Sequence, residues 1–292
     1  MPDSTPPEVR PEARPGVHPD TAPDTVIDIP TDARPVPFRG GGFRPRRHPF
    51  LAPLVLLILL GLWQLGSSSG FISPIAMPAP KDVLIAFRDL ITTGTLWTNL
   101  SISLYRLLTG WLLGAALGIT VGLMIGLFSQ ARAAALPIVS ALFPVPKIAL
   151  LPLFIIWFGI GEGSKVATIL FGTFFPTVIS TYAGVDAVDR GLIRMGQSFG
   201  LKWTSIVRKI IIPGAMPGIL SGFRISFSIA IVLLVAAEMI GAQHGIGAYI
   251  LMAGAIFNLG ELFAGVIILS AIGLVGSWLI GKAEKRLLDW RA

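Results

Sequence analysis

The sequence predicts an all-α polytopic membrane protein with six transmembrane helices. Two compositional observations favour this class: 53% of the residues are hydrophobic, and only 13% are charged. A soluble domain usually carries about 25% charged residues. The third observation is that apolar stretches of about 20 residues, the length needed to cross a bilayer, recur along the chain. The expected spans lie near residues 49–69, 107–128, 137–159, 166–185, 214–241 and 262–281.

Residues 1–48 differ from the rest of the chain. They contain eleven prolines and almost no residues that could form a core, which is typical of a disordered segment. Four arginines between residues 39 and 47 directly precede the first span, and such clusters mark the cytoplasmic side of a membrane. We therefore expect a disordered, Pro/Arg-rich cytoplasmic tail over 1–48 and a transmembrane domain over 49–292.

The loops alternate sides once the N-terminus is placed in the cytoplasm. Segment 70–106 is then external and is expected to hold an amphipathic helix, with Trp97 and Tyr105 at interface depth. Segment 242–261 could hide a seventh crossing, but its lack of Lys and Arg favours a re-entrant or external helix. The remaining loops are expected at 129–136, 186–213 and the C-terminus on the cytoplasmic side, and at 160–165 outside.

The second span carries a regular row of glycines. Small residues at every fourth position let two helix backbones approach closely in lipid. The row predicts either a surface on which another helix slides or plain packing within the bundle. Its members are Gly110, Gly114, Gly118, Gly122 and Gly126.

The third span is interrupted by prolines around Lys147. Proline removes a helical hydrogen bond, and freed carbonyls at membrane depth survive only inside protein or beside a wet cavity. One interpretation is a broken helix that lines a translocation path; the other is a helix that begins near residue 147, with the lysine reaching the inner surface. The prolines are Pro137, Pro144, Pro146 and Pro152.

The cytoplasmic loop 186–213 is expected to form an amphipathic helix over 190–212 that ends at Pro213. Such a helix would lie on its own bundle or in the groove of a partner, and we favour the partner. The apolar stripe comprises Phe199, Trp203, Ile206 and Ile210, and the cationic stripe comprises Lys202, Ser205 and Lys209.

The composition also argues against several functions. The chain has no cysteine and three histidines, so no metal site and no cofactor is expected. The few carboxylates are scattered, which argues against an enzyme. We attribute the net charge of +7 to cytoplasmic loops and contact with membrane lipid rather than to nucleic acid.

The loop resembles the coupling loop of ABC-importer permeases, whose pattern runs E-A-A-x3-G-x9-I-x-L-P. Here Gly200, Ile210 and Ile212-Pro213 match, while Arg194, Met195 and Gly196 replace E-A-A. The segments "SISLYRLLTG", "LLPLFIIWFGIGEGSK" and "GFRISFSIAIVLLVAAEMIGAQHGIGAYI" resemble the nitrate/sulfonate/taurine/bicarbonate subfamily, over about residues 70–290.

The resemblance implies a type I ABC-importer permease (MetI-like) fold in a bacterial inner membrane, with both termini cytoplasmic. It further implies a homodimer, two cytoplasmic ATPase subunits and an extracytoplasmic solute-binding protein, so that ATP hydrolysis takes place on a partner. By position, the residues expected to couple to the ATPase are Arg194, Gly200, Lys202, Trp203, Arg208, Lys209, Ile210 and Pro213.

The solute implied by the resemblance is a small anion of the sulfonate, taurine, nitrate or bicarbonate type. We therefore consider Arg106, Lys147, Arg224 and Glu238 as translocation-path residues; Arg224 and Glu238 share a helix face but lie too far apart to pair. The alternatives are a self-contained secondary transporter, a permease for a thiamine-precursor-like heterocycle, and a membrane scaffold.

Overall fold

The computed structural model describes residues 50–73 and 76–289, which form helices and connecting loops without a β-strand. Of these, the residues from 55 onward cluster as one compact unit. The predicted disordered tail lies outside the described residues. The elements are α1 (Leu51–Ser68), α2 (Pro80–Thr92), α3 (Thr95–Leu127), α4 (Ser129–Leu142), η1 (Lys147–Leu150), α5 (Leu151–Phe158), α6 (Glu162–Asp186), α7 (Arg190–Ser198), α8 (Trp203–Ile206), η2 (Val207–Ile211), α9 (Ile212–Gly241), α10 (Ile246–Ala255) and α11 (Leu259–Leu287).

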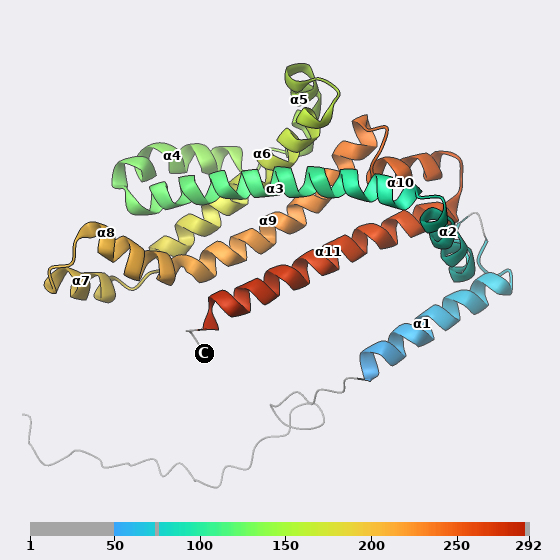
Figure 1. Ribbon diagram of the computed structural model, residues 1–292, viewed down its shortest axis with the longest axis horizontal. Helices are drawn as coiled ribbons and strands as arrows, with labels where there is room; N and C mark the ends of the chain where they lie inside the picture. Colours follow the sequence, from blue (N-terminus) through green and yellow to red (C-terminus); the bar gives the residue numbers. More distant parts are fainter. Residues whose placement is uncertain (1–49, 74–75, 290–292) are drawn as a thin grey trace, which may run out of the picture. The chain divides into compact units, whose positions relative to one another are not determined.

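Three long helices form the centre of the bundle: α6 packs between α3 and α9. Helix α10 packs against α9 and α11 at one end of the bundle, and α7 and α8 lie at the other end (Figure 1). The bundle thus has an α10 end and an α7 end, and these names are kept below.

The spans agree largely with the prediction. Among the described residues, four helical runs are long and apolar enough to cross a membrane: Thr95–Leu127, Glu162–Asp186, Trp203–Gly241 and Leu259–Leu287. A fifth span is present if α4 and the η1–α5 segment count as one crossing bent by 91°. Helix α1 is apolar but shorter than these runs. The protein is therefore a multi-pass membrane protein, and the sixth crossing stays a prediction.

The expected boundaries were wrong at several loops. Residues 95–106 belong to the 33-residue helix α3 rather than to an external amphipathic helix, because Gly94, at φ 77°, ends the turn after α2 and α3 starts at once. Trp97 and Tyr105 are exposed on this helix. The expected loop 129–136 forms most of α4, and α6 begins inside the expected loop 160–165.

Pro213 does not end the coupling segment, contrary to the expectation. Helix α8, the π-helical turn η2 and α9 form one run, Trp203–Gly241, and Pro213 lies in the first turn of α9. A proline interrupts a helix because it lacks an N–H donor and crowds the preceding turn. The wider π turn η2, which ends at Ile211, contains the residues whose carbonyls Pro213 would crowd and relieves that conflict, so the helix continues.

The glycine row packs against α6 within the same chain. A Cβ atom added at Gly114 would lie 2.1 Å from the Thr173 hydroxyl oxygen, and one at Gly118 would lie 2.7 Å from Thr177 Cβ. The hydroxyls of Thr173 and Thr177 donate to carbonyls one turn earlier in α6, so their polar atoms are satisfied inside the contact. Of the two interpretations left open, the structure shows intramolecular packing.

Helix α10 accounts for the ambiguous segment 242–261. It has 10 residues, or about 15 Å at 1.5 Å per residue, roughly half of a bilayer's hydrocarbon core. A seventh crossing by this helix alone is therefore excluded, in agreement with the favoured re-entrant or external helix.

Candidate functional site

The segment between α6 and α9 bends sharply at Gly200. The Asp189 side chain accepts a hydrogen bond from the Gly191 N–H at 2.7 Å and caps the start of α7. After α7, Gly200 N–H donates to Gln197 and Leu201 N–H donates to Gly196, the two bonds of a Schellman motif. Gly200 has φ 69°, which glycine adopts without a Cβ penalty. Gly200 is therefore the point at which the chain turns between α7 and α8.

The predicted apolar stripe is divided between two environments. Ile206 is 2% exposed and packs with Val185, Val188 and neighbouring residues of α9. Phe199 and Trp203 are 77% and 49% exposed. The expectation of one continuous stripe was wrong because the turn at Gly200 reorients the chain between α7 and α8.

The predicted coupling residues form an exposed surface, with two exceptions. Ile210 and Pro213 are half-buried, whereas the others are exposed. None of the exposed cations has an ion pair among the described residues. Two further apolar residues, Leu192 and Met195, were not predicted; they are exposed on α7 and share the helical spacing i, i+3, i+7 with Phe199. The coupling surface comprises Leu192, Arg194, Met195, Phe199, Gly200, Lys202, Trp203, Arg208 and Lys209.

A buried ion network lies at the α10 end. Arg106 of α3 donates from Nε and Nη2 to the two oxygens of Glu162 in α6, both at 2.6 Å. Its Nη1 donates to Glu238 of α9 at 2.8 Å and to the His244 carbonyl at 2.7 Å. Arg106 and Glu238 are 2% and 0% exposed. One guanidinium therefore joins three helices and the α9–α10 connection.

The other contacts of Glu238 hold the start of α10. Its carboxylate accepts hydrogen bonds from the Ser103 hydroxyl and from the Gly247 N–H, both at 2.8 Å. The Ser103 oxygen accepts from the Ile246 N–H at 2.9 Å. Gly245 is required here, because an added Cβ would lie 2.4 Å from a Glu238 oxygen. The network therefore fixes α10 to α3 and α9.

The structure brings together two of the four predicted path residues, Arg106 and Glu238. Arg224 instead donates to Glu284 of α11 at 2.5 Å. Although Arg224 and Glu238 share a face of α9, they therefore bind different partners and do not belong to one site. Glu162 was missed because the segment around it was expected to be a loop. As a single carboxylate before an apolar run, it gave only a weak signal.

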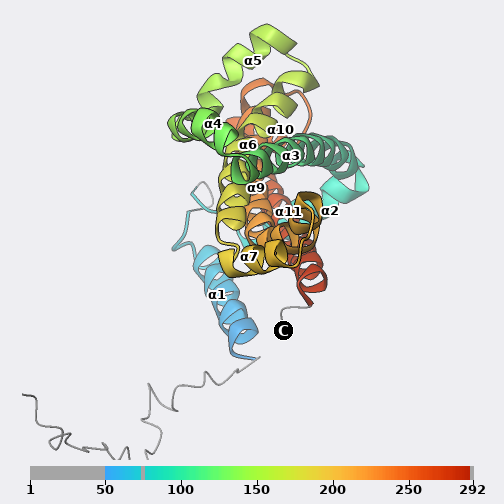
Figure 2. The same ribbon diagram turned by 90° about the vertical axis from the view of Figure 1, so that its left-hand side faces the viewer.

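Lys147 lies at the break of the third span. Its ammonium donates to the carbonyls of Leu142 and Phe143, the last turn of α4, and lies 5.1 Å from the centre of the Phe175 ring. Helix α5 turns away after the break and projects from the α3–α6–α9 core in both views (Figures 1 and 2). The lysine thus satisfies carbonyls that the break frees, which combines elements of both interpretations left open.

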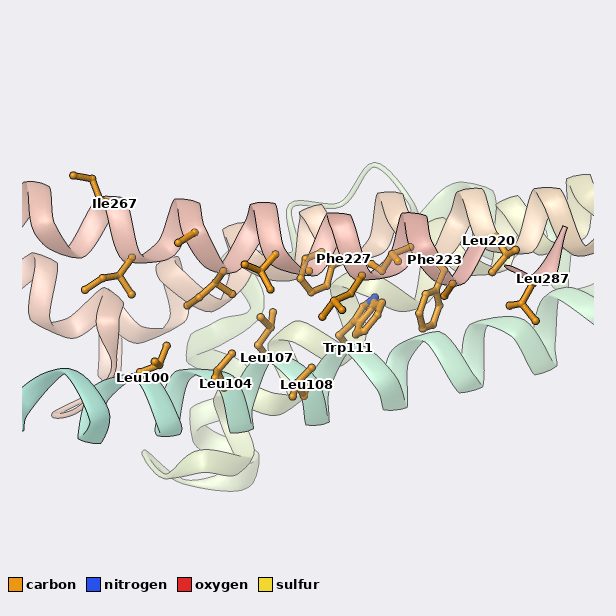
Figure 3. Close-up of a pocket in the computed structure, with 18 of the residues that line it drawn as sticks. Leu100, Leu104, Leu107, Leu108, Trp111, Leu220, Phe223, Phe227, Ile267 and Leu287 are labelled. Atoms are coloured by element: carbon orange, nitrogen blue, oxygen red, sulfur yellow. The ribbon is translucent and has the colours of Figure 1, made fainter. Parts of the chain in front are cut away.

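An apolar cavity of about 930 Å³ lies between α3, α9 and α11 (Figure 3). The centre of the Trp111 ring lies 4.2 Å from that of the Phe223 ring and 4.9 Å from that of the Phe227 ring. Trp111 Nε1 donates a hydrogen bond to the Ser226 hydroxyl at 3.0 Å. None of the described residues that line the cavity is charged, so this lining suits acyl chains or another apolar helix and offers an anion no charged partner.

The fold defines the class of protein: a polytopic permease with the helical architecture of ABC importers. The methionine ABC transporter solved in inward facing conformations is similar, with a TM-score of 0.55 at 21% identity over 66% of this chain and 94% of that one. Residues 114–289 match the family described as binding-protein-dependent transport system inner membrane component. The chain belongs to this family and is a transport permease subunit of the inner membrane.

Curated relatives cover most of the chain. A putative aliphatic sulfonates transport permease of Bacillus subtilis is 36% identical over 84% of this chain and 90% of its own. The taurine transport system permease of Escherichia coli is 35% identical over 80% and 87%. The formylaminopyrimidine transport permease of Halalkalibacterium halodurans is 30% identical over 84% and 98%.

These similarities confirm the predicted family and the transport role. As an ABC permease of this family, the chain acts with an ATPase and a substrate-binding protein. ATP hydrolysis therefore belongs to a partner, and the chain itself is not an enzyme. The self-contained secondary transporter and the scaffold are set aside.

Proposed function

We propose that this permease imports small aliphatic sulfonates, including taurine-type compounds, by alternating access. The observation that carries the proposal is the similarity at 35–36% identity to sulfonate and taurine permeases over at least 80% of the chain. The relative that transports formylaminopyrimidine is less similar, at 30%. A heterocycle is therefore the second candidate, followed by nitrate and bicarbonate.

The α7 end of the bundle is cytoplasmic in this proposal. Five basic residues between 186 and 213, together with the basic C-terminal turn of α11, support this orientation under the positive-inside rule. The Arg224–Glu284 pair joins the C-terminal part of α11 to the N-terminal half of α9. The basic last turn of α11 and the basic coupling loop are therefore on the same side of the membrane in this proposal. Both termini are then cytoplasmic, and the α10 end faces the substrate-binding protein.

The coupling surface is the docking site for the ATPase. Exposed Phe199 and Trp203 beside exposed cations fit the mixed aromatic and basic character of protein interfaces. Because η2 and α9 continue α8 without a break, a movement of this surface would be passed directly to α9, one of the three long helices at the centre of the bundle. Two permease copies and two ATPases would form the complete transporter.

Sulfonate transport tests the proposal in proteoliposomes that contain the permease, its ATPase and its binding protein. We expect ATP-dependent uptake of labelled taurine or an alkanesulfonate, and competition by unlabelled sulfonates but not by nitrate, bicarbonate or an aminopyrimidine. A complex that accumulates the aminopyrimidine and ignores sulfonates would replace the proposal with the second candidate.

Gly200→Val is expected to weaken the contact between the permease and its ATPase. A β-branched residue at φ 69° is strained by about 1–3 kcal/mol, so the turn between α7 and α8 would change shape. Binding-protein-stimulated ATPase activity and uptake should both fall about tenfold at an unchanged amount of permease in the membrane. Gly200→Asn is the matched control, because asparagine tolerates this backbone region. Equal uptake by the valine variant would contradict the docking assignment.

A further inference from the structure

Lys147 lies beside the middle of the membrane-spanning helix α6. A Cβ atom added at Gly172 would lie 3.7 Å from Lys147 Cβ, and the Lys147 ammonium lies over the ring of Phe175. Both neighbours are near the centre of α6, which runs from Glu162 to Asp186. The ammonium is therefore placed far from both ends of this helix.

The charge of Lys147 is not neutralised by a carboxylate among the described residues. Arg132 pairs with Asp186, and Arg224 pairs with Glu284. Arg106 pairs with Glu162 and Glu238. Lys165 donates to the carbonyls of Ile160 and Gly161 and also lies close to the same two glutamates. The two cations and the two carboxylates of this cluster therefore have no net charge. Within the part of the chain that the structure describes, the partners of the Lys147 ammonium are two carbonyls and two aromatic rings.

One donor of the ammonium remains available. An ammonium has three N–H donors, and the carbonyls of Leu142 and Phe143 accept from two of them. The side chain is partly exposed, and the adjoining Phe143 is 44% exposed. Since a charged group that faces lipid at this depth is strongly unfavourable, this surface of the α4–α5 break is expected to face a water-filled passage.

We infer that Lys147 contacts the sulfonate group of the solute as it passes through the membrane. This inference rests on the proposed function and adds the residue that selects an anion. The one remaining donor gives a single charge-assisted hydrogen bond rather than an enclosing set of ligands, so a solute in transit can leave it. Lys147 is thus a specificity residue of the path as well as a cap for α4.

Three variants separate these two roles of Lys147. Lys147→Gln keeps donors for the two carbonyls but removes the charge, Lys147→Arg keeps the charge, and Lys147→Met removes both. The variants are compared in the complete transporter in proteoliposomes. The measurements are sulfonate uptake, ATPase stimulation by the binding protein, and the thermal unfolding midpoint.

We expect sulfonate uptake to depend on the positive charge at position 147. Uptake by the Gln and Met variants should fall about tenfold to a hundredfold, the value of one charge-assisted hydrogen bond, while the Arg variant stays within about threefold. The unfolding midpoint of the Gln variant should not change. Full uptake by the Gln variant, or equal losses in all three, would overturn the inference and leave capping alone. A wild-type complex that transports no sulfonate would instead refute the proposed function and, with it, this assignment.

Discussion

Arg106→Met is expected to destabilise the permease by about 3–5 kcal/mol, the largest effect of any single substitution considered. The change leaves Glu238 fully buried without its cation, and it also leaves Glu162 and the His244 carbonyl without a donor. Removal of one partner from a buried ion pair costs more than the pair itself contributes, because the remaining charge is not solvated. The free energy of unfolding, measured by detergent titration, checks this expectation.

Two further variants test whether burial causes the effect. Glu162→Gln should cost only about 1 kcal/mol, because the glutamine oxygen can still accept a hydrogen bond from Arg106 and Glu238 still neutralises the guanidinium. The double variant Arg106→Met/Glu238→Gln should recover part of the loss, because it removes both charges. If Arg106→Met proved as stable as the wild-type protein, the network would have no structural role.

Gly118→Val is expected to separate α3 from α6 and to destabilise the bundle by about 3 kcal/mol, at the upper end for an overpacked core. A Cβ at this position would lie 2.7 Å from Thr177 Cβ and 2.8 Å from the Phe174 carbonyl oxygen. The carbonyl belongs to the backbone of α6, so the whole helix must move and side-chain rotation cannot relieve the clash. Both the unfolding midpoint and uptake should fall.

Ala116→Ile is the matched control for this substitution. Ala116 lies on the same helix two residues earlier but is exposed on the outside of the bundle. A larger aliphatic side chain there meets lipid rather than α6, so stability and uptake should stay close to the wild-type values. Equal losses in both variants would show that helix α3 tolerates no added bulk and that the glycine row has no special role.

Local patterns were sufficient for several predictions. The glycine row indicated close helix packing because its spacing of four residues matches one helix face. The prolines around Lys147 indicated a broken span. The spacing from Gly200 to Pro213 indicated the coupling loop, in which Gly200 has a φ of 69°. Each of these features depends on residues that are close together in the chain, and their order can be read from the sequence.

Contacts between distant segments could not be predicted in the same way. The partner of Arg106 depends on the packing of α6 between α3 and α9, which brings Glu162 and Glu238 to one guanidinium. Likewise, Trp203 is exposed and Ile206 buried because the turn at Gly200 decides which side of α8 meets the bundle.

The sequence by itself determined the class of protein, most of its spans and the place of its coupling loop, because hydropathy, charge and spacing act over short stretches of chain. The tertiary structure alone decided which charges are neutralised. Arg106, Arg224 and Glu238 have charged partners 56 or more residues away, whereas the Lys147 ammonium has carbonyl and ring partners among the described residues. The physical reason is that a charge in a membrane must find its partner in space, and the distance along the chain does not limit where that partner lies.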